Sequence, residues 1–174
     1  MPVWILRLGH RLPRDERIST HCGLVARAFG SEGIIFSGQE DKGLLESIQR
    51  ITNKWGGLFE VRYEKNWKNV IKNFKSQGYY TVLLTMYGIN LPDIIDKVRK
   101  KVNLLVIVGS EKVPGDVYGL CDAQVAVGNQ PHSEIAALAI FLDRYFKGEC
   151  LNKEFSGKIK VMPQLKGKKI INST

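Results

Sequence analysis

Short apolar runs alternate along the chain with segments in which apolar residues recur every three or four positions. The runs predict strands over residues 3–8, 33–36, 58–63, 81–85, 104–108 and 124–127. The periodic segments predict helices over residues 20–29, 42–55, 67–77, 91–101 and 133–146, and Asp41 and Asn66 are placed to cap two of them. This alternation is typical of an α/β protein in which helices cover both faces of a parallel sheet.

Polar loops that contain glycine follow two of the predicted strands. Gly109 comes directly after the run 104–108, and Gly128 follows the run 124–127 and leads into the last predicted helix. Ligands of open α/β sheets bind beyond the carboxyl ends of the strands, and glycine lets the backbone approach a ligand closely. The residues alone fit a ligand site and a pair of ordinary β–α turns equally well.

Two common nucleotide-binding fingerprints are absent from the sequence. Gly9 is a single glycine after the first predicted strand, where a dinucleotide-binding turn needs three. Gly167 precedes two lysines but lacks the upstream glycine and the strand of a phosphate-binding P-loop. The sequence therefore argues against an ordinary Rossmann enzyme and against a P-loop protein.

Positive charge is concentrated in two stretches of the chain, which carries a net charge of +9 over 174 residues. Arginines gather near the start, and residues 147–174 hold seven lysines against two glutamates. Two basic patches favour a nucleic-acid partner that presents phosphates, whereas a surface of solvated lysines is the alternative. The predicted RNA-binding residues are Arg7, Arg11, Arg14, Arg17, Lys166, Lys168 and Lys169.

The cysteines and the apolar runs indicate in which cellular compartment the protein works. Cys22, Cys121 and Cys150 match neither a zinc spacing nor a disulfide framework. No apolar run approaches the roughly 20 residues that span a bilayer, and the start of the chain lacks the basic region of a signal peptide. We therefore expect a single-domain cytoplasmic protein that uses neither a membrane nor a metal.

Three segments, in this order, resemble the motifs of the SPOUT (SpoU–TrmD) RNA methyltransferases. The first, residues 20–30, places Arg27 six positions after the polar His21 and ends in Phe-Gly. The second is the Val-Gly-Ser-Glu at residues 108–111, and the third is the stretch 128–137. Together with the Leu-Arg-Leu-Gly-His-Arg at residues 6–11, they resemble more narrowly the archaeal branch that methylates the ribose of cytidine 56 in the TΨC loop of tRNA.

The resemblance implies properties that the residue pattern does not predict. They are a parallel-sheet SPOUT fold with a C-terminal deep trefoil knot, a homodimer, S-adenosyl-L-methionine as methyl donor and tRNA as substrate. A methyltransferase domain would span residues 1–147, and residues 148–174 would form a basic C-terminal arm or appended element. The cofactor would lie against Leu84, Gly109, Ser110, Glu111, Lys112, Val127, Gly128, Asn129, Gln130, Pro131, His132, Ser133 and Glu134.

The resemblance also suggests catalytic residues for attack by a ribose 2′-hydroxyl on a sulfonium methyl group. Arg27 stands where the SpoU branch has its catalytic arginine, whereas His21 replaces an asparagine of that branch. Because arginine stays protonated, Arg27 would hold the ribose and a phosphate, or act through that phosphate. Histidine changes its protonation near neutral pH, so His21 or His132 is the alternative base.

Two rival functions remain open at this stage. One is a SPOUT methyltransferase with another RNA target, such as ribosomal RNA or a base nitrogen. The other is a basic RNA-binding module without catalytic activity, which would not bind S-adenosyl-L-methionine.

Overall fold

A parallel sheet forms the centre of the molecule. The computed structural model describes residues 1–109 and 113–172, and within them six strands form this sheet in the order β3-β2-β1-β5-β4-β6, with every neighbouring pair parallel. The strands are β1 (Val3–His10), β2 (Gly33–Gly38), β3 (Glu60–Tyr63), β4 (Tyr80–Asn90), β5 (Leu104–Val108) and β6 (Ala123–Ala126). The predicted α/β architecture with a parallel sheet is confirmed.

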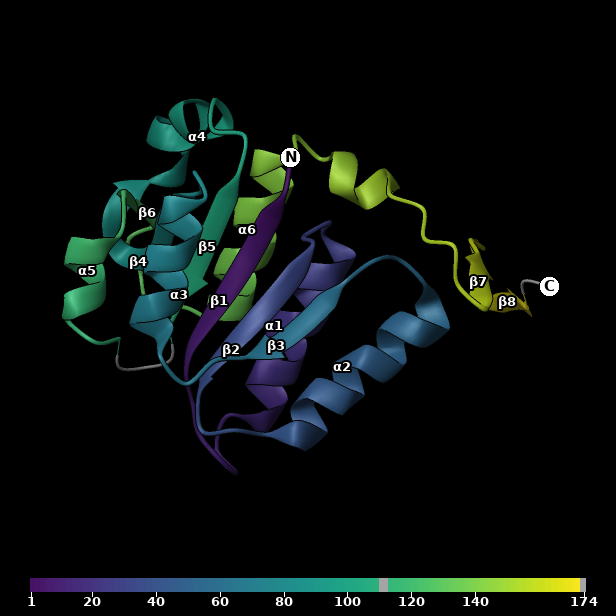
Figure 1. The fold of residues 1–174 in the computed structure, drawn as a ribbon. Coiled ribbons are helices and arrows are strands. Elements are labelled where there is room, and N and C mark those ends of the chain that lie inside the picture. Colours follow the sequence, from purple (N-terminus) through teal and green to yellow (C-terminus); the bar gives the residue numbers. More distant parts are fainter. Residues whose placement is uncertain (110–112, 173–174) are drawn as a thin grey trace.

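Helices cover both faces of this sheet. They are α1 (Glu16–Ala28), α2 (Lys42–Trp55), α3 (Trp67–Ser76), α4 (Leu91–Arg99), α5 (Asp116–Leu120) and α6 (Glu134–Tyr145). In β1, Val3 and Ile5 face the cluster formed with α1, α2, α4 and α6, whereas Trp4 and Leu6 face the cluster formed with α3 and α5. In Figure 1, α1 and α6 accordingly lie behind β1. Burial of both faces explains why the strands read as continuous apolar runs.

Most element boundaries match the sequence-based expectation, and two of the exceptions have a structural explanation. Asp41 and Asn66 accept hydrogen bonds from the backbone N–H groups of Leu44 and Asn69, as expected of helix caps. β4 does not end at residue 85 but continues to Asn90 after an irregularity in its pairing with β6. The short α5 was not predicted, because its five residues hold too few turns to show a helical period.

The C-terminal residues form a β-hairpin that projects from the sheet. After the 3-10 helix η1 (Glu149–Asn152), the chain leads to β7 (Ile159–Met162) and β8 (Lys169–Asn172), which pair antiparallel (Figure 1). Its base is tied to the end of α2, where Lys158 N–H donates to the Lys54 carbonyl at 3.0 Å. A Cβ on Gly56 would lie 2.3 Å from the Ser156 backbone, so the two segments are in close contact.

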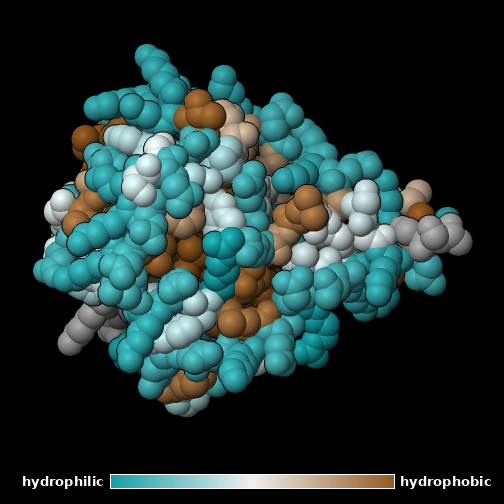
Figure 2. Space-filling model, viewed as in Figure 1, coloured by the Kyte–Doolittle hydropathy of each residue, from teal (hydrophilic) through white to brown (hydrophobic). Residues whose placement is uncertain are grey.

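The face of the molecule seen in Figure 2 is largely hydrophilic. In this view, hydrophobic residues gather near the middle, over the strands between α3 and α2. The Arg62 guanidinium lies 4.8 Å from the centre of the Trp4 ring and is paired with Glu60. Among the described residues, no helix combines the length and apolar character needed to cross a bilayer.

Candidate functional site

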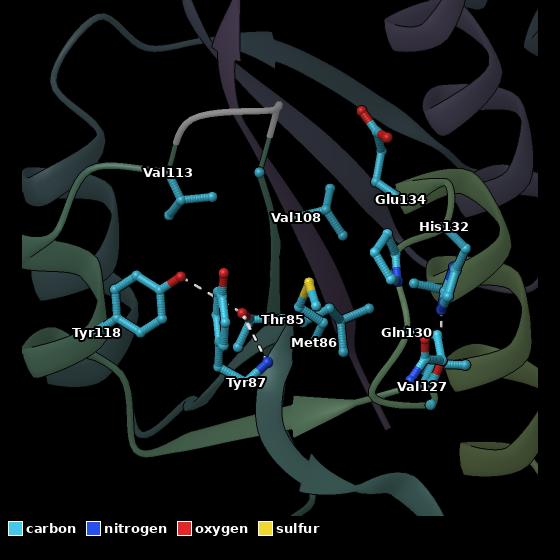
Figure 3. Close-up of a pocket in the computed structure, with 15 residues that line it drawn as sticks. Thr85, Met86, Tyr87, Val108, Val113, Tyr118, Val127, Gln130, His132 and Glu134 are labelled. Atoms are coloured by element: carbon cyan, nitrogen blue, oxygen red, sulfur yellow. Dashed lines mark hydrogen bonds between the residues drawn. The ribbon is translucent and has the colours of Figure 1, made fainter.

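A cavity of about 380 Å³ lies beyond the carboxyl ends of β4, β5 and β6, where the sequence predicts a ligand site. Figure 3 shows Tyr118 and Val113 on one side, and Gln130, His132 and Glu134 on the other, with Val108 between them. The lining consists of Leu84, Thr85, Met86, Tyr87, Val108, Gly109, Val113, Tyr118, Val127, Gly128, Gln130, Pro131, His132, Glu134 and Ala137.

A bulge in β4 shapes one wall of this cavity. Leu84 and Ile89 both pair with Val125 of β6, so residues 85–88 are left out of the ladder. Gly88 lies against β6 so closely that a Cβ would be 2.5 Å from the Val125 nitrogen. Thr85 is therefore turned into the cavity, where its hydroxyl is 3.5 Å from the Tyr118 hydroxyl (Figure 3). Through this bulge, β4 contributes the polar Thr85 and the aromatic Tyr87 to the cavity lining.

Two asparagines fix the start of the loop that joins β6 to α6, residues 127–133. The side-chain oxygen of Asn90 accepts from Gly128 N–H at 3.1 Å. The Asn129 amide donates to the carbonyl oxygens of Met86 and Gly88, at 2.8 and 3.2 Å. This loop and the β4 bulge therefore form one hydrogen-bonded unit around the cavity.

An ion pair fixes the other end of the same loop and corrects one expectation. Arg7 was predicted to bind RNA, but its side chain is fully buried, because it points from β1 toward α1 and α6. One of its terminal nitrogens donates to the Leu8 carbonyl at 2.6 Å and the other to Glu134 Oε1 at 3.0 Å. Cys22 lies beside this pair, and burial raises the pKa of its thiol to about 12 although the Arg7 charge opposes the shift. Arg7 is thus unsuited to hold a phosphate.

The cavity brings together most of the predicted cofactor residues that the structure describes. Leu84, Gly109, Val127, Gly128, Gln130, Pro131, His132 and Glu134 line it, whereas the side chains of Asn129 and Ser133 bond to backbone groups instead. Ser133 caps α6 by accepting from Ile135 N–H at 3.1 Å. The predicted residues Ser110, Glu111 and Lys112 lie outside the described residues.

Sequence reasoning missed several lining residues. They are Thr85, Met86, Tyr87, Val108, Val113, Tyr118 and Ala137. Val108 was available as the last residue of a predicted strand. Tyr118 lies on the unpredicted α5, and residues 85–87 owe their position to the bulge, so no periodic pattern identifies them.

The two candidate histidines lie in different surroundings. His132 lines the cavity, and its ring nitrogens face the carbonyl oxygens of Val127 and Ser133, at 2.5 and 3.1 Å. Since a carbonyl only accepts, a neutral imidazole can satisfy only one of these contacts and would direct its lone pair at the other oxygen. His21 is exposed on α1 and is absent from the cavity lining. In the arrangement described, neither ring presents a free lone pair to the cavity.

Arg27 lies near the amino ends of the strands, whereas the cavity lies at their carboxyl ends. α1 begins near the carboxyl end of β1 and ends beside its first residue, where Glu32 N–H donates to the Val3 carbonyl at 2.8 Å. Arg27 is almost fully buried there, donates to the Gly56 carbonyl and lies 4.8 Å from the centre of the Phe155 ring. Burial lowers the pKa of its guanidinium. Its charge faces the carboxyl ends of α1 and α2, whose dipoles favour a cation.

The arginines that follow β1 lie at the carboxyl ends of the strands, as the cavity does. The β1–α1 connection, residues 11–15, follows His10, and β1 is the neighbour of β5 in the sheet. Arg11 is held by Asp15 at 3.1 Å with part of its side chain exposed, and Arg14 is exposed. Arg17, in the first turn of α1, is exposed as well. Lys166, Lys168 and Lys169 are exposed on the C-terminal hairpin, at a separate place on the molecule.

A serine, a histidine and an aspartate meet beneath this connection. His10 Nδ1 is 2.8 Å from Ser19 Oγ, and its Nε2 is 3.3 Å from Asp41 Oδ2. Ser19 is fully buried, so no substrate reaches its hydroxyl and the trio cannot act as a hydrolytic triad. It ties β1, α1 and α2 together below the arginines. Within residues 1–109 and 113–172, no group of three or more metal-ligating side chains occurs.

The fold is that of the SpoU/TrmH class of RNA methyltransferases. The structure described as the SpoU methyltransferase AviRb from Streptomyces viridochromogenes, in complex with the cofactor AdoMet, matches 83% of this chain and 57% of that chain with a TM-score of 0.59. Sequence identity in this match is 18%, which shows the fold alone.

The sequence comparisons are more specific. A family model described as tRNA ribose 2′-O-methyltransferase, aTrm56, matches residues 55–171. The tRNA (cytidine(56)-2′-O)-methyltransferase of Methanothrix thermoacetophila is 49% identical over 99% of this chain and 98% of its own length. The enzyme of that name from Methanocaldococcus jannaschii is 51% identical over 98% of this chain and 97% of its own length. The chain therefore belongs to the family of tRNA ribose 2′-O-methyltransferases, which confirms the resemblance seen in the sequence.

Proposed function

We propose that this protein transfers a methyl group from S-adenosyl-L-methionine to the ribose 2′-oxygen of cytidine 56 in tRNA. The observation that carries the proposal is the cavity at the carboxyl ends of β4, β5 and β6, in a chain about half identical over nearly its full length to tRNA (cytidine(56)-2′-O)-methyltransferases. A cavity of about 380 Å³ falls in the range of roughly 300–1,000 Å³ that is common for small-molecule sites.

The lining suits the proposed cofactor. Leu84, Val108 and Val127 offer an apolar slot for an adenine ring, and backbone groups of the loops at Gly109 and Gly128 are available to its polar edge. When bound, the cofactor supplies an electrophilic methyl group on a sulfonium centre. The complex of AviRb with AdoMet supports this assignment, because that protein has the same fold. Ser110, Glu111 and Lys112 remain proposed cofactor residues on sequence grounds.

We propose that the arginine-rich connection and the C-terminal hairpin bind the tRNA backbone. Arg11, Arg14 and Arg17 lie at the edge of the sheet that carries the cavity, so they are placed to hold phosphates near a ribose that enters it. Lys166, Lys168 and Lys169 would contact a more distant part of the same tRNA. Holding the 2′-hydroxyl in line with the methyl group is a large part of such catalysis, since orientation can supply about 7–11 kcal/mol.

The proposed catalytic role of Arg27 requires a second chain. Within one chain, α1 separates Arg27 from the cavity edge by roughly 17 Å, taking about 1.5 Å per helical residue from Glu16. We propose a homodimer in which Arg27 of one chain serves the ribose at the cavity of the other. His21 and His132 remain candidate proton acceptors, and His132 would first have to leave one of its two carbonyl contacts.

Three further properties are proposed from the family resemblance. The first is a deep trefoil knot in the C-terminal part of the fold, for which the resemblance to the SPOUT motifs is the support. The second is a division into a methyltransferase domain over residues 1–147 and an arm over residues 148–174, which the projecting hairpin supports. The third is a cytoplasmic location, where tRNA is found.

The decisive test is to incubate the full chain with methyl-labelled S-adenosyl-L-methionine and unmodified tRNA, and to map the modified nucleotide. We expect label on the ribose of cytidine 56, and none on a tRNA that carries 2′-deoxycytidine at this position. Label elsewhere would indicate a SPOUT enzyme with another target. Binding of tRNA without binding of the cofactor would indicate an RNA-binding module instead.

A further inference from the structure

Arg7 occupies a position that an apolar residue would normally fill. It shares a face of β1 with Val3 and Ile5, pairs in register with Phe36 and Val108, and has no exposed surface. Burying a guanidinium is unfavourable unless a partner compensates the charge. Glu134 is the one carboxylate among residues 1–109 and 113–172 within ion-pair distance of it. The Glu134 carboxylate therefore compensates the buried charge of Arg7.

That partner stands at the end of the cavity loop. Glu134 is the first residue of α6, and Figure 3 shows it across the cavity from Tyr118. The start of the loop is held by Asn90 and Asn129, whereas residues 129–133 between the two anchors are exposed. Asn90 and Asn129 thus hold the start of the loop by hydrogen bonds, and the Arg7–Glu134 ion pair holds its end.

We propose that Arg7 is a positioning residue that acts through Glu134 to hold the loop of residues 127–133 in its cofactor-binding arrangement. This inference rests on the proposed function, because it takes the cavity to be the S-adenosyl-L-methionine site. Arg7 touches neither the cavity nor any proposed RNA surface. Its replacement should therefore weaken cofactor binding, while tRNA binding measured without cofactor stays at the wild-type level.

The experiment is a double-mutant cycle read out by calorimetric titration of the full chain with S-adenosyl-L-methionine. We expect Arg7→Met to raise the cofactor Kd about ten-fold or more, which corresponds to about 1.4 kcal/mol. In a Glu134→Leu background the same substitution should not raise the Kd further, because Arg7 then has no carboxylate to position and its replacement only removes an uncompensated buried charge. The double variant should fold, since apolar replacement of a buried pair is often neutral for stability.

A conservative variant and a control separate positioning from general stability. Arg7→Lys keeps the charge but replaces the two terminal nitrogens of the guanidinium by a single ammonium group, so its Kd should fall between wild type and Arg7→Met. It serves as the test if Arg7→Met does not fold. Arg62→Met removes another arginine–glutamate pair, on the distant β3, and should leave the cofactor Kd unchanged.

The outcomes are distinguishable. A wild-type Kd in folded Arg7→Met or Arg7→Lys overturns the proposal, and so does an equal loss with and without Glu134. Wild-type protein that does not bind the cofactor at all overturns the proposed function itself.

Discussion

Replacement of Arg27 by methionine tests whether this residue stabilises the folded protein, takes part in methyl transfer, or does both. The substitution keeps the apolar stem but removes the hydrogen bond to the Gly56 carbonyl and the contact with the Phe155 ring. A hydrogen bond from a charged group contributes about 1.5–3 kcal/mol, and a cation–π contact roughly 0.5–1 kcal/mol. Against these, methionine avoids burying a charge whose pKa is already lowered by desolvation.

The net loss should be about 2 kcal/mol in the free energy of unfolding. For a chain of this size that corresponds to a fall of about 4–8 °C in Tm, taking roughly 2–4 °C for each kcal/mol. The measurement is a thermal melt followed by circular dichroism. Arg50→Met is the control, because Arg50 is exposed on α2, and its Tm should match that of wild type.

Turnover per folded molecule, measured well below the Tm, then separates the two roles. If Arg27 also holds the ribose, Arg27→Lys should lose most of its turnover while the cofactor Kd stays near wild type, since lysine lacks the bidentate fork. An unchanged Tm in Arg27→Met would refute the argument from its surroundings. Wild-type turnover in Arg27→Lys would refute the catalytic proposal and leave Arg27 as a framework residue.

Three further predictions follow from the cavity and the core. Gly128→Val should weaken cofactor binding about ten-fold by calorimetry, because Gly128 has a φ of 75° that costs roughly 1–2 kcal/mol for other residues; an unchanged Kd in folded protein would count against the loop. Mixing Arg27→Ala chains with Gly128→Val chains should restore activity if the site is shared between subunits, and heterodimers without activity would exclude this. Because burial raises the pKa of Cys22 from 9.0 to about 12, its thiol stays protonated in the folded protein while the unfolded chain ionises. Stability should thus fall as the pH rises from about 9 toward 12, less steeply in Cys22→Ala, and identical alkaline curves would contradict the argument.

The sequence predicts the sheet and the place of the cavity, because both depend on local patterns. Apolar runs identify the strands, and Gly109 and Gly128 mark the strand ends that meet around the cavity. Positions that depend on pairing between distant segments are not predictable in this way. The β4 bulge is defined by the pairing of both Leu84 and Ile89 with Val125 of β6, and Thr85, the first residue left out of that pairing, lines the cavity.

At Arg7, two features of the sequence point in opposite directions. Arg7 lies among other arginines, which favoured a surface role, yet it follows Val3 and Ile5 in the period-two pattern of a strand that is buried on both faces. Its partner Glu134 is 127 positions away in the chain, so the pattern identifies the buried position but not the compensating charge.

The strand order has a consequence for how the protein is made. β1 is synthesised before the other five strands of this sheet, yet it lies inside the sheet between β2 and β5, and Val3 pairs with Leu104 about one hundred residues later. A nascent chain can pair β1 with β2, and β2 with β3, early, but the other side of β1 keeps its backbone donors and acceptors unpaired until β5 emerges. Contacts of such long sequence separation slow folding. The half-formed sheet is therefore the state of this chain that is most exposed to edge-to-edge aggregation during synthesis.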